Sequence, residues 1–129
     1  MVRHLSEDWV ALHAKAGATL PERAGASARL QHVVTGSPDG EVVWSLVLVD
    51  GRVADAAVGR DDDAADCSFL ITHPDSVLIA RGELDLHAGF MQGRVKMSGD
   101  MGRLMAVLPC TQSDEFKAVL AEVASATDF

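Results

Sequence analysis

Several residue types that often anchor small proteins or mark processing signals are scarce in this sequence. There is no tyrosine, and the only two cysteines, Cys67 and Cys110, form no Cys-x-x-Cys motif and are predicted to be free thiols. Unbroken apolar runs such as Leu46–Val49 are far too short to span a bilayer. The first residues carry acids in place of a secretory apolar segment, and residues 126–129 are not a peroxisomal address. These absences predict a cytoplasmic protein.

Basic residues are also few. The 11 Lys and Arg residues face 19 Asp and Glu residues, which gives a net charge of −8. This balance argues against a nucleic-acid partner, because phosphate binding depends on clustered Lys and Arg. It also predicts at most transient contact with anionic membranes. Apolar residues make up 48% of the chain and charged residues 23%, so disorder is not expected, and the length predicts one domain over residues 1–129.

The N-terminal half has the pattern of one helix followed by strands. Residues 7–16 carry apolar side chains at helical spacing, with Ser6 as a candidate N-cap. The pair Asp50-Gly51 favours a tight hairpin between two β-branched runs. The predicted strands are 30–35, 42–49, 52–58 and 66–72. The acidic run 60–63 between the last two lacks the spacing of a calcium loop and is interpreted as solvated.

The C-terminal half is mostly helical. A helix is expected to begin near Pro74 and to end at Gly82, and a second short helix covers residues 83–90. A strand follows at 94–98, then a helix that Pro109 ends and a last helix over 113–127 capped by Ser113. The order of elements predicts an α+β fold in which helices cover a mostly antiparallel sheet.

Motifs for catalysis and metal binding are missing. No Gly-x-Ser-x-Gly or His-Glu-x-x-His motif is present, and Cys67 lies in a strand pattern typical of an inert core thiol. His73 and Asp75 stand at a helix start, where capping accounts for them. An acid–base pair such as Asp75 and His87 can be drawn, but the sequence does not place the two together. We therefore predict no catalytic residue, no metal site and no cofactor.

The C-terminal third concentrates long, flexible and large apolar side chains. Four of the five methionines fall between positions 91 and 105. Such residues pack a helix–sheet core or line an apolar pocket, where methionine adapts to ligand shape, and periodicity alone leaves both readings open. The residues concerned are Phe90, Met91, Met97, Met101, Leu104, Met105, Leu108, Phe116, Leu120 and Val123.

One segment carries a recognisable motif. Residues 89–102, GFMQGRVKMSGDMG, resemble the hallmark of the sterol carrier protein 2 family, which runs aromatic, apolar, Gln-Gly, basic, apolar, Lys, apolar, Ser/Thr-Gly-Asn/Asp-Met-Gly. Upstream, the order of Ala65-Asp66-Cys67 and Arg81-Gly82-Glu83-Leu84 is similar to the same family. The resemblance extends from about Val33 to Leu108.

This resemblance implies a five-stranded sheet and helices that enclose a hydrophobic tunnel. Family members bind sterols, fatty acids, fatty acyl-CoA or phospholipids and have no catalytic activity by themselves, although some are fused to enzymes. Carried over to this chain, the resemblance places Phe90, Met91 and the polar Gln92 at the tunnel. Residues of the next helix and of the closing C-terminal helix would complete the wall, namely Met101, Leu104, Met105, Leu108, Phe116, Leu120 and Val123.

The chain departs from the family pattern after Met101-Gly102. Arg103-Leu104 stands where a Leu-Ala pair is common, so Leu104 would narrow or redirect the tunnel, and Arg103 would face solvent or an acidic head group. Our leading hypothesis is a non-catalytic cytoplasmic carrier of an apolar lipid. An interaction or regulatory module with a filled tunnel is the alternative. A lipid-acting isomerase or lyase that uses His73, Asp75 or His87 ranks third.

Overall fold

The structure is a computed structural model that describes all residues 1–129. Its core is a five-stranded sheet with the strand order β4-β3-β2-β5-β6. Neighbouring strands are antiparallel except for the central β2 and β5, which are parallel. The strands of this sheet are β2 (Ala28–Ser37), β3 (Gly40–Val49), β4 (Arg52–Val58), β5 (Cys67–Thr72) and β6 (Lys96–Gly99). The α+β class and the mostly antiparallel sheet are therefore as the sequence predicts.

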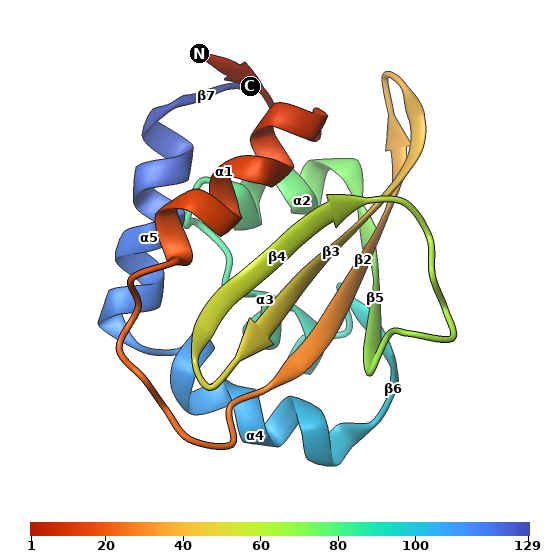
Figure 1. Ribbon diagram of the computed structural model, residues 1–129. Coiled ribbons are helices and arrows are strands. Elements are labelled where there is room, and N and C mark those ends of the chain that lie inside the picture. Colours follow the sequence, from red (N-terminus) through yellow and green to blue (C-terminus); the bar gives the residue numbers. More distant parts are fainter.

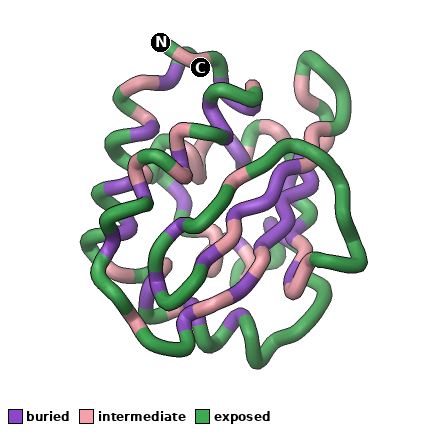
Figure 2. The backbone as a smooth tube through the Cα atoms, in the orientation of Figure 1, coloured by how far each residue is buried: buried purple, intermediate pink, exposed green.

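Helices gather on one face of this sheet (Figure 1). The five helices are α1 (Glu7–Gly17), α2 (His73–Ala80), α3 (Leu86–Met91), α4 (Met101–Thr111) and α5 (Asp114–Ser125). Helix α1 packs on β4 and on α5. None of these helices is long and apolar enough to cross a bilayer. Buried residues concentrate in the central strands and on the inward sides of the helices, while the outer loops are exposed (Figure 2).

Local signals in the sequence account for most element boundaries. The Ser6 and Ser113 hydroxyls cap α1 and α5 by accepting hydrogen bonds from backbone N–H groups, as predicted. Asp50 and Gly51 both adopt positive φ, of 47° and 87°, which the predicted tight hairpin between β3 and β4 requires. Helix α3 begins later than expected, because Asp85 caps it by accepting from the Ala88 N–H.

One expectation about the end of a helix needs correction, and one small sheet was not expected. Pro109 lies inside α4, which continues to Thr111, whereas the sequence predicts a helix stop there. Proline withholds one hydrogen bond from the carbonyl of Met105, and since both residues are exposed, water can satisfy that carbonyl. No sequence signal predicts the small parallel sheet that joins β1 (Val2–Arg3) to β7 (Thr127–Asp128) and brings the termini together (Figure 1).

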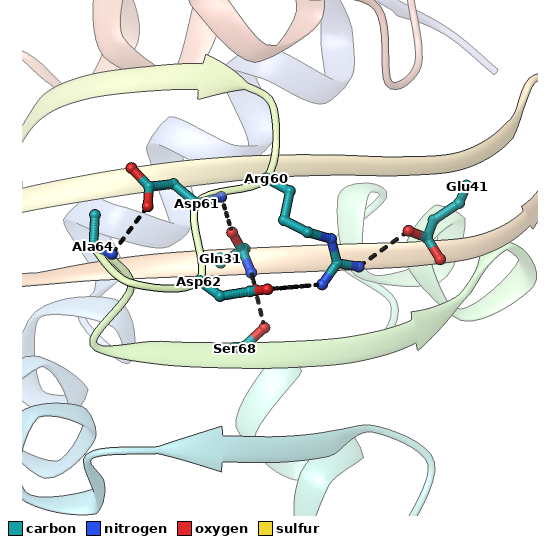
Figure 3. A network of polar contacts seen from close by, with 7 residues as sticks. All are labelled: Gln31, Glu41, Arg60, Asp61, Asp62, Ala64 and Ser68. Atoms are coloured by element: carbon teal, nitrogen blue, oxygen red, sulfur yellow. Dashed lines mark hydrogen bonds and ion pairs between the residues drawn. The ribbon is translucent and has the colours of Figure 1, made fainter.

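A polar cluster fixes the loop on the helix-free side of the sheet (Figure 3). Gln31 is fully buried on β2, and its Nε2 donates to Asp62 Oδ1 over 2.8 Å and to Ser68 Oγ over 3.2 Å. Its Oε1 accepts from the Asp61 N–H over 2.8 Å. Arg60 pairs with Asp62 and with Glu41, and the Gln31 and Arg60 hydrogen bonds lower the pKa of Asp62. The acidic loop is thus exposed to solvent, as expected, but also anchored.

Candidate functional site

A cavity of about 540 Å³ lies between the sheet and the helices. Most of its lining side chains are apolar, and they come from strands β2, β3 and β5, from all five helices and from the segment before α1. Ligand pockets typically measure about 300–1,000 Å³, so the volume suits a small lipid or drug-sized molecule. The cavity has one end where the lining residues are buried and another where lining residues are exposed.

A row of stacked rings crosses the sheet at the buried end. His32 on β2 pairs in register with Trp44 on β3 and with Phe69 on β5, so the three side chains share one face. The rings of His32 and Trp44 are stacked with centroids 4.1 Å apart, and those of His32 and Phe69 lie 5.7 Å apart. All three are buried, and all three line the cavity.

Residues of the N-terminal segment complete this end. Trp9 on α1 makes edge-to-face contacts with His4, His13 and Trp44 at centroid distances of 4.6 to 5.1 Å. His13 binds the carbonyl oxygens at positions 9 and 10 through its Nδ1, at 3.0 and 3.3 Å. His4 Nε2 lies 3.3 Å from Ser76 Oγ on α2. We call this cluster the histidine end; its members are His4, Trp9, His13, His32 and Trp44.

Burial keeps the three histidines of this end uncharged at neutral pH. It lowers the pKa of His4 to about 4, and repulsion from His73, His13 and Arg81 acts in the same direction. It lowers the pKa of His32 to about 3, again with a contribution from His13. The pKa of His13 is lowered by burial as well, against the opposing effect of its two backbone hydrogen bonds. A neutral imidazole offers one donor and one acceptor, so the three imidazoles are polar but not charged.

Some hydrogen-bonding capacity at the histidine end is unused. The Nε1 of Trp9, the Nδ1 of His4 and the Nδ1 of His32 are buried and have no partner in the protein. An unpaired buried polar group costs about 1–3 kcal/mol, so three in one cluster are unusual for a region that serves packing alone. The cluster nevertheless does not bring three His, Cys, Asp or Glu side chains into a metal-binding group.

The middle of the cavity is apolar. Leu104 and Leu108 project from α4, Phe116 and Leu120 from α5, and Phe90 from α3. Leu104 and Phe116 are buried, and the other three are half-buried. The sequence predicts that all five residues contact a ligand, and the structure brings them together around one cavity. That they contact a ligand stays a prediction.

The other end of the cavity opens between the segment after α2 and helix α5. Its exposed lining residues, here called the rim, are Gly82, Asp85, Gln112, Lys117 and Ala121. Arg81 also lines the cavity and is exposed, but it lies close to His4 and Phe129, whose rings are 5.3 Å apart. Gln112 Nε2 donates to Asp85 Oδ1 over 2.9 Å, which ties the end of α4 to the start of α3. The guanidinium of Arg81 lies 4.9 Å from the centre of the Phe129 ring. A ligand can therefore reach the apolar middle from this side.

Five other predicted site residues do not line the cavity. Met91 is 71% exposed, Met105 57% and Met101 46%, and Gln92 is an exposed residue at the end of α3. Val123 is buried, but in the hydrophobic core. The expectation that the methionines form an interior lining is thus wrong for these three.

For Met101 and Met105 the reason is the rotation of α4. Its large apolar residues suggest a buried stripe that includes Met101 and Met105, but the stripe that faces the sheet runs through Leu104, Val107 and Cys110. Val107 is fully buried, whereas the methionines lie to the side of this stripe. Arg103 does not reach the cavity either; its Nη1 donates to the carbonyl oxygen of Ser27.

The residues considered for catalysis remain apart. Asp75 Oδ1 accepts from Arg94 Nη2 over 2.6 Å, which occupies its carboxylate. Of the three candidates, only His87 lines the cavity, and it stands near the rim. Cys67 and Cys110 are buried free thiols whose pKa values are raised by burial, so neither is poised as a nucleophile.

Sequence reasoning missed the histidine end. His4, His13 and His32 match no metal motif, and Trp9 and Trp44 are apolar positions of a helix and a strand pattern. The one available signal was His32, a polar residue that shares a strand face with Leu30 and Val34 by the period of two; Gln31 and Val33 on the other face are buried as well. A polar residue on a buried face indicates a specific role, but the partners on other elements could not be assigned without the fold.

The fold and the cavity define a small α+β protein that encloses a ligand-sized apolar space beneath a helical layer. The family model described as SCP-2 sterol transfer family matches residues 10–109. Because this match covers most of the chain, the protein belongs to the SCP-2 sterol transfer family.

A curated relative is similar in sequence, and two solved structures share the fold. The chain is 29% identical over 73 residues to sterol carrier protein 2 of Oryctolagus cuniculus; the match covers 56% of this chain and only 13% of that much longer protein. A crystal structure of sterol carrier protein 2 superposes with a TM-score of 0.72 at 18% identity, covering 95% of this chain and 97% of the other. A Thermus thermophilus protein described as a candidate sterol carrier protein gives a TM-score of 0.69 at 18% identity, with coverage of 95% and 91%.

The same fold occurs inside an enzyme chain. A double mutant of a sec-alkyl sulfatase superposes with a TM-score of 0.52 at 26% identity, covering 80% of this chain but 15% of that one. Family membership therefore supports a role in lipid binding or transfer, while the full activity of longer relatives does not transfer to this chain.

Proposed function

We propose that this protein holds one apolar lipid in its cavity and carries it without chemical change. The observation that carries the proposal is the apolar cavity of about 540 Å³ between the sheet and helices α4 and α5. A ligand gains about 25 cal/mol for each Å² of apolar surface removed from water, so burial in such a space is favourable with few polar contacts. The ligand classes we propose are sterols, fatty acids and fatty acyl-CoA.

The arrangement of polar groups favours carriage over catalysis. The histidines of the histidine end have no carboxylate among the groups that shift their pKa values, so none is paired as in an acid–base catalyst. Asp75, the acid of the lyase or isomerase hypothesis, is occupied by Arg94 and does not line the cavity. We therefore rank that hypothesis last.

The size of the cavity also weighs against a module with a filled tunnel. Leu104 is larger than the residue common in the family and lines the wall, yet a volume of about 540 Å³ remains beside it. A packed core would leave voids of few water molecules at most.

We further propose that the protein acts in the cytoplasm and contacts membranes only transiently. The net charge of −8 is repelled by the negative surface of cytoplasmic membranes, so long residence there is not favoured.

Native mass spectrometry of protein purified from cells tests the proposal. We expect a population whose mass exceeds that of the chain by one lipid, released on denaturation and identified after extraction. Binding of a fluorescent fatty acid by the delipidated protein, with displacement by unlabelled lipids, gives the second measurement. Repeated absence of a copurified lipid, together with no binding of sterol, fatty acid or acyl-CoA, would refute the function.

A further inference from the structure

The histidine end presents hydrogen-bonding groups whose donor or acceptor character is fixed by partners inside the protein. Nδ1 of His13 lies 3.0 Å from the carbonyl oxygen of Trp9 and 3.3 Å from that of Val10. A carbonyl oxygen only accepts, so Nδ1 carries the hydrogen. In the neutral ring, the other nitrogen, Nε2, is then an acceptor with a free lone pair.

His4 also has an unpaired acceptor nitrogen, because its other nitrogen donates to a serine hydroxyl. The hydroxyl of Ser76 donates to the carbonyl oxygen of His73 over 2.7 Å, so its oxygen is left to accept from His4 Nε2 at 3.3 Å. His4 therefore carries its hydrogen on Nε2, and its Nδ1 is an acceptor without a partner. The unpaired nitrogens of these two histidines thus carry lone pairs and not N–H groups, and that of His4 is sealed within the cluster.

The lone pair on His13 is open to a ligand. Nε2 makes no hydrogen bond within the protein, and it is not one of the sealed polar atoms that lack partners. The side chain is only 3% exposed and lines the cavity, so the surface that Nε2 retains faces the cavity. The acceptor is therefore aimed at the space that the ligand would occupy.

We propose that the histidine end binds the hydroxyl group of a lipid, which donates its hydrogen to Nε2 of His13, and that it excludes an ionised carboxylate. The inference rests on the proposed lipid-binding function and assigns the ligand's orientation and chemical class. The ligand enters with its hydroxyl end toward the sheet, and its apolar body lies against α4 and α5. A carboxylate has no hydrogen to donate, and its oxygens would face the lone pair of Nε2.

The surroundings of His13 keep this preference in force at neutral pH. The titratable groups around it are His4 from the segment before α1 and His32 from β2; His73 of α2 and Arg81 act on His4. None of these groups is acidic, so none favours a protonated imidazole. An acid can be bound there only if it brings or takes up a proton, which presents an O–H to Nε2 again.

Titration calorimetry on the wild-type protein provides the first test. Palmityl alcohol and palmitate have the same apolar chain and differ in the head group. At pH 7 we expect the alcohol to bind at least about tenfold more tightly, because palmitate must take up a proton that its carboxyl group has lost in water at this pH. We expect palmitate to bind with uptake of about one proton, measured from the heats in two buffers of different ionisation enthalpy.

Variants at position 13 locate the effect. His13→Phe keeps a ring and removes the acceptor. The affinity for the alcohol should therefore fall about tenfold, and the alcohol should no longer bind more tightly than palmitate. His13→Gln, which retains an acceptor oxygen, should restore part of the advantage. His73→Phe is the control, because His73 lies beside the cluster but does not line the cavity, and it should keep the alcohol preference. Thermal unfolding verifies that each variant is folded.

The possible results separate the subsite from the function itself. Palmitate that binds as tightly as the alcohol without proton uptake would overturn the subsite, as would a folded His13→Phe protein that keeps the alcohol preference. The calorimetry on the wild-type protein decides the question even if the variants do not fold. Failure of the alcohol, palmitate and a sterol alike to bind would refute the proposed function instead.

Discussion

Replacing Leu104 by tryptophan should block the cavity, and the neighbouring Met105 provides a matched control. Leu104 is 5% exposed and lines the cavity, whereas Met105 is 57% exposed on the outside of the same helix. The added indole of Leu104→Trp would take space within a cavity of about 540 Å³. If it displaces about three ligand methylenes at about 0.8 kcal/mol each, binding weakens by about 2.4 kcal/mol, or about fifty-fold.

The assay is displacement of a fluorescent fatty acid from the delipidated proteins, with thermal unfolding measured in parallel. An extrinsic fluorophore is needed, since each variant adds a tryptophan. We expect Met105→Trp to bind like the wild type, because its side chain points to solvent. Unchanged lipid affinity in a folded Leu104→Trp protein would show that the ligand does not occupy this cavity. Equal losses in both variants would mean that the effect does not come from the cavity wall.

Three further predictions concern stability. Gln31→Leu should lower the free energy of unfolding by about 2–4 kcal/mol and expose the acidic loop to proteolysis, because it removes every hydrogen bond shown from Gln31 in Figure 3; an intact loop and unchanged urea midpoint would contradict this. Because the folded pKa values of His4 and His32 are about 4 and about 3 against 6.5 when unfolded, the unfolded chain binds more protons, so stability is full above pH 6.5 and is lost below it. The free energy of unfolding should fall by on the order of 3 kcal/mol between pH 6.5 and pH 4.5, after allowance for partial hydration of His4. The same free energy of urea unfolding at both pH values would refute this prediction. Gly17→Ala should cost about 1–3 kcal/mol in the same measurement, since the new Cβ would overlap the Val53 side chain; a neutral result would show that α1 shifts easily on β4.

Local chemistry allowed most of the fold to be predicted. Side chains that accept hydrogen bonds from backbone N–H groups three residues further on, such as Ser6 and Ser113, mark the starts of helices. The pair Asp50-Gly51 marks a hairpin because both residue types tolerate the positive φ that the turn requires. The parallel contact between β2 and β5 and the β1–β7 pair depend instead on residues far apart in the chain. Such pairings have no local signature, and the sequence alone could supply at most the strands themselves.

The candidate site divides in the same way. The apolar middle could be predicted only through the resemblance, because helical spacing of bulky residues fits a core and a pocket equally well; Leu104 and Phe116 indeed line the cavity. Spacing does not determine how a helix is rotated on its sheet, so it assigns Met101 and Met105 to the interior although they lie outside. The buried glutamine of this fold is Gln31, not Gln92, because the latter caps a helix at the surface.

The two ends of the cavity stand in different relations to the family. The motif that identifies the chain lies at residues 89–102. It supplies Phe90 to the apolar wall and ends two residues before Leu104, which lines the same wall. The histidine end lies outside this motif: His4 and Trp9 precede the matched residues 10–109, and His13, His32 and Trp44 fall within them but far from residues 89–102 in the sequence. An apolar wall accepts many lipid bodies with little discrimination, whereas a buried acceptor that faces the cavity, such as Nε2 of His13, discriminates among head groups. Specificity in this chain should therefore follow the residues that the family motif does not contain, and ligand choice cannot be read from family membership alone.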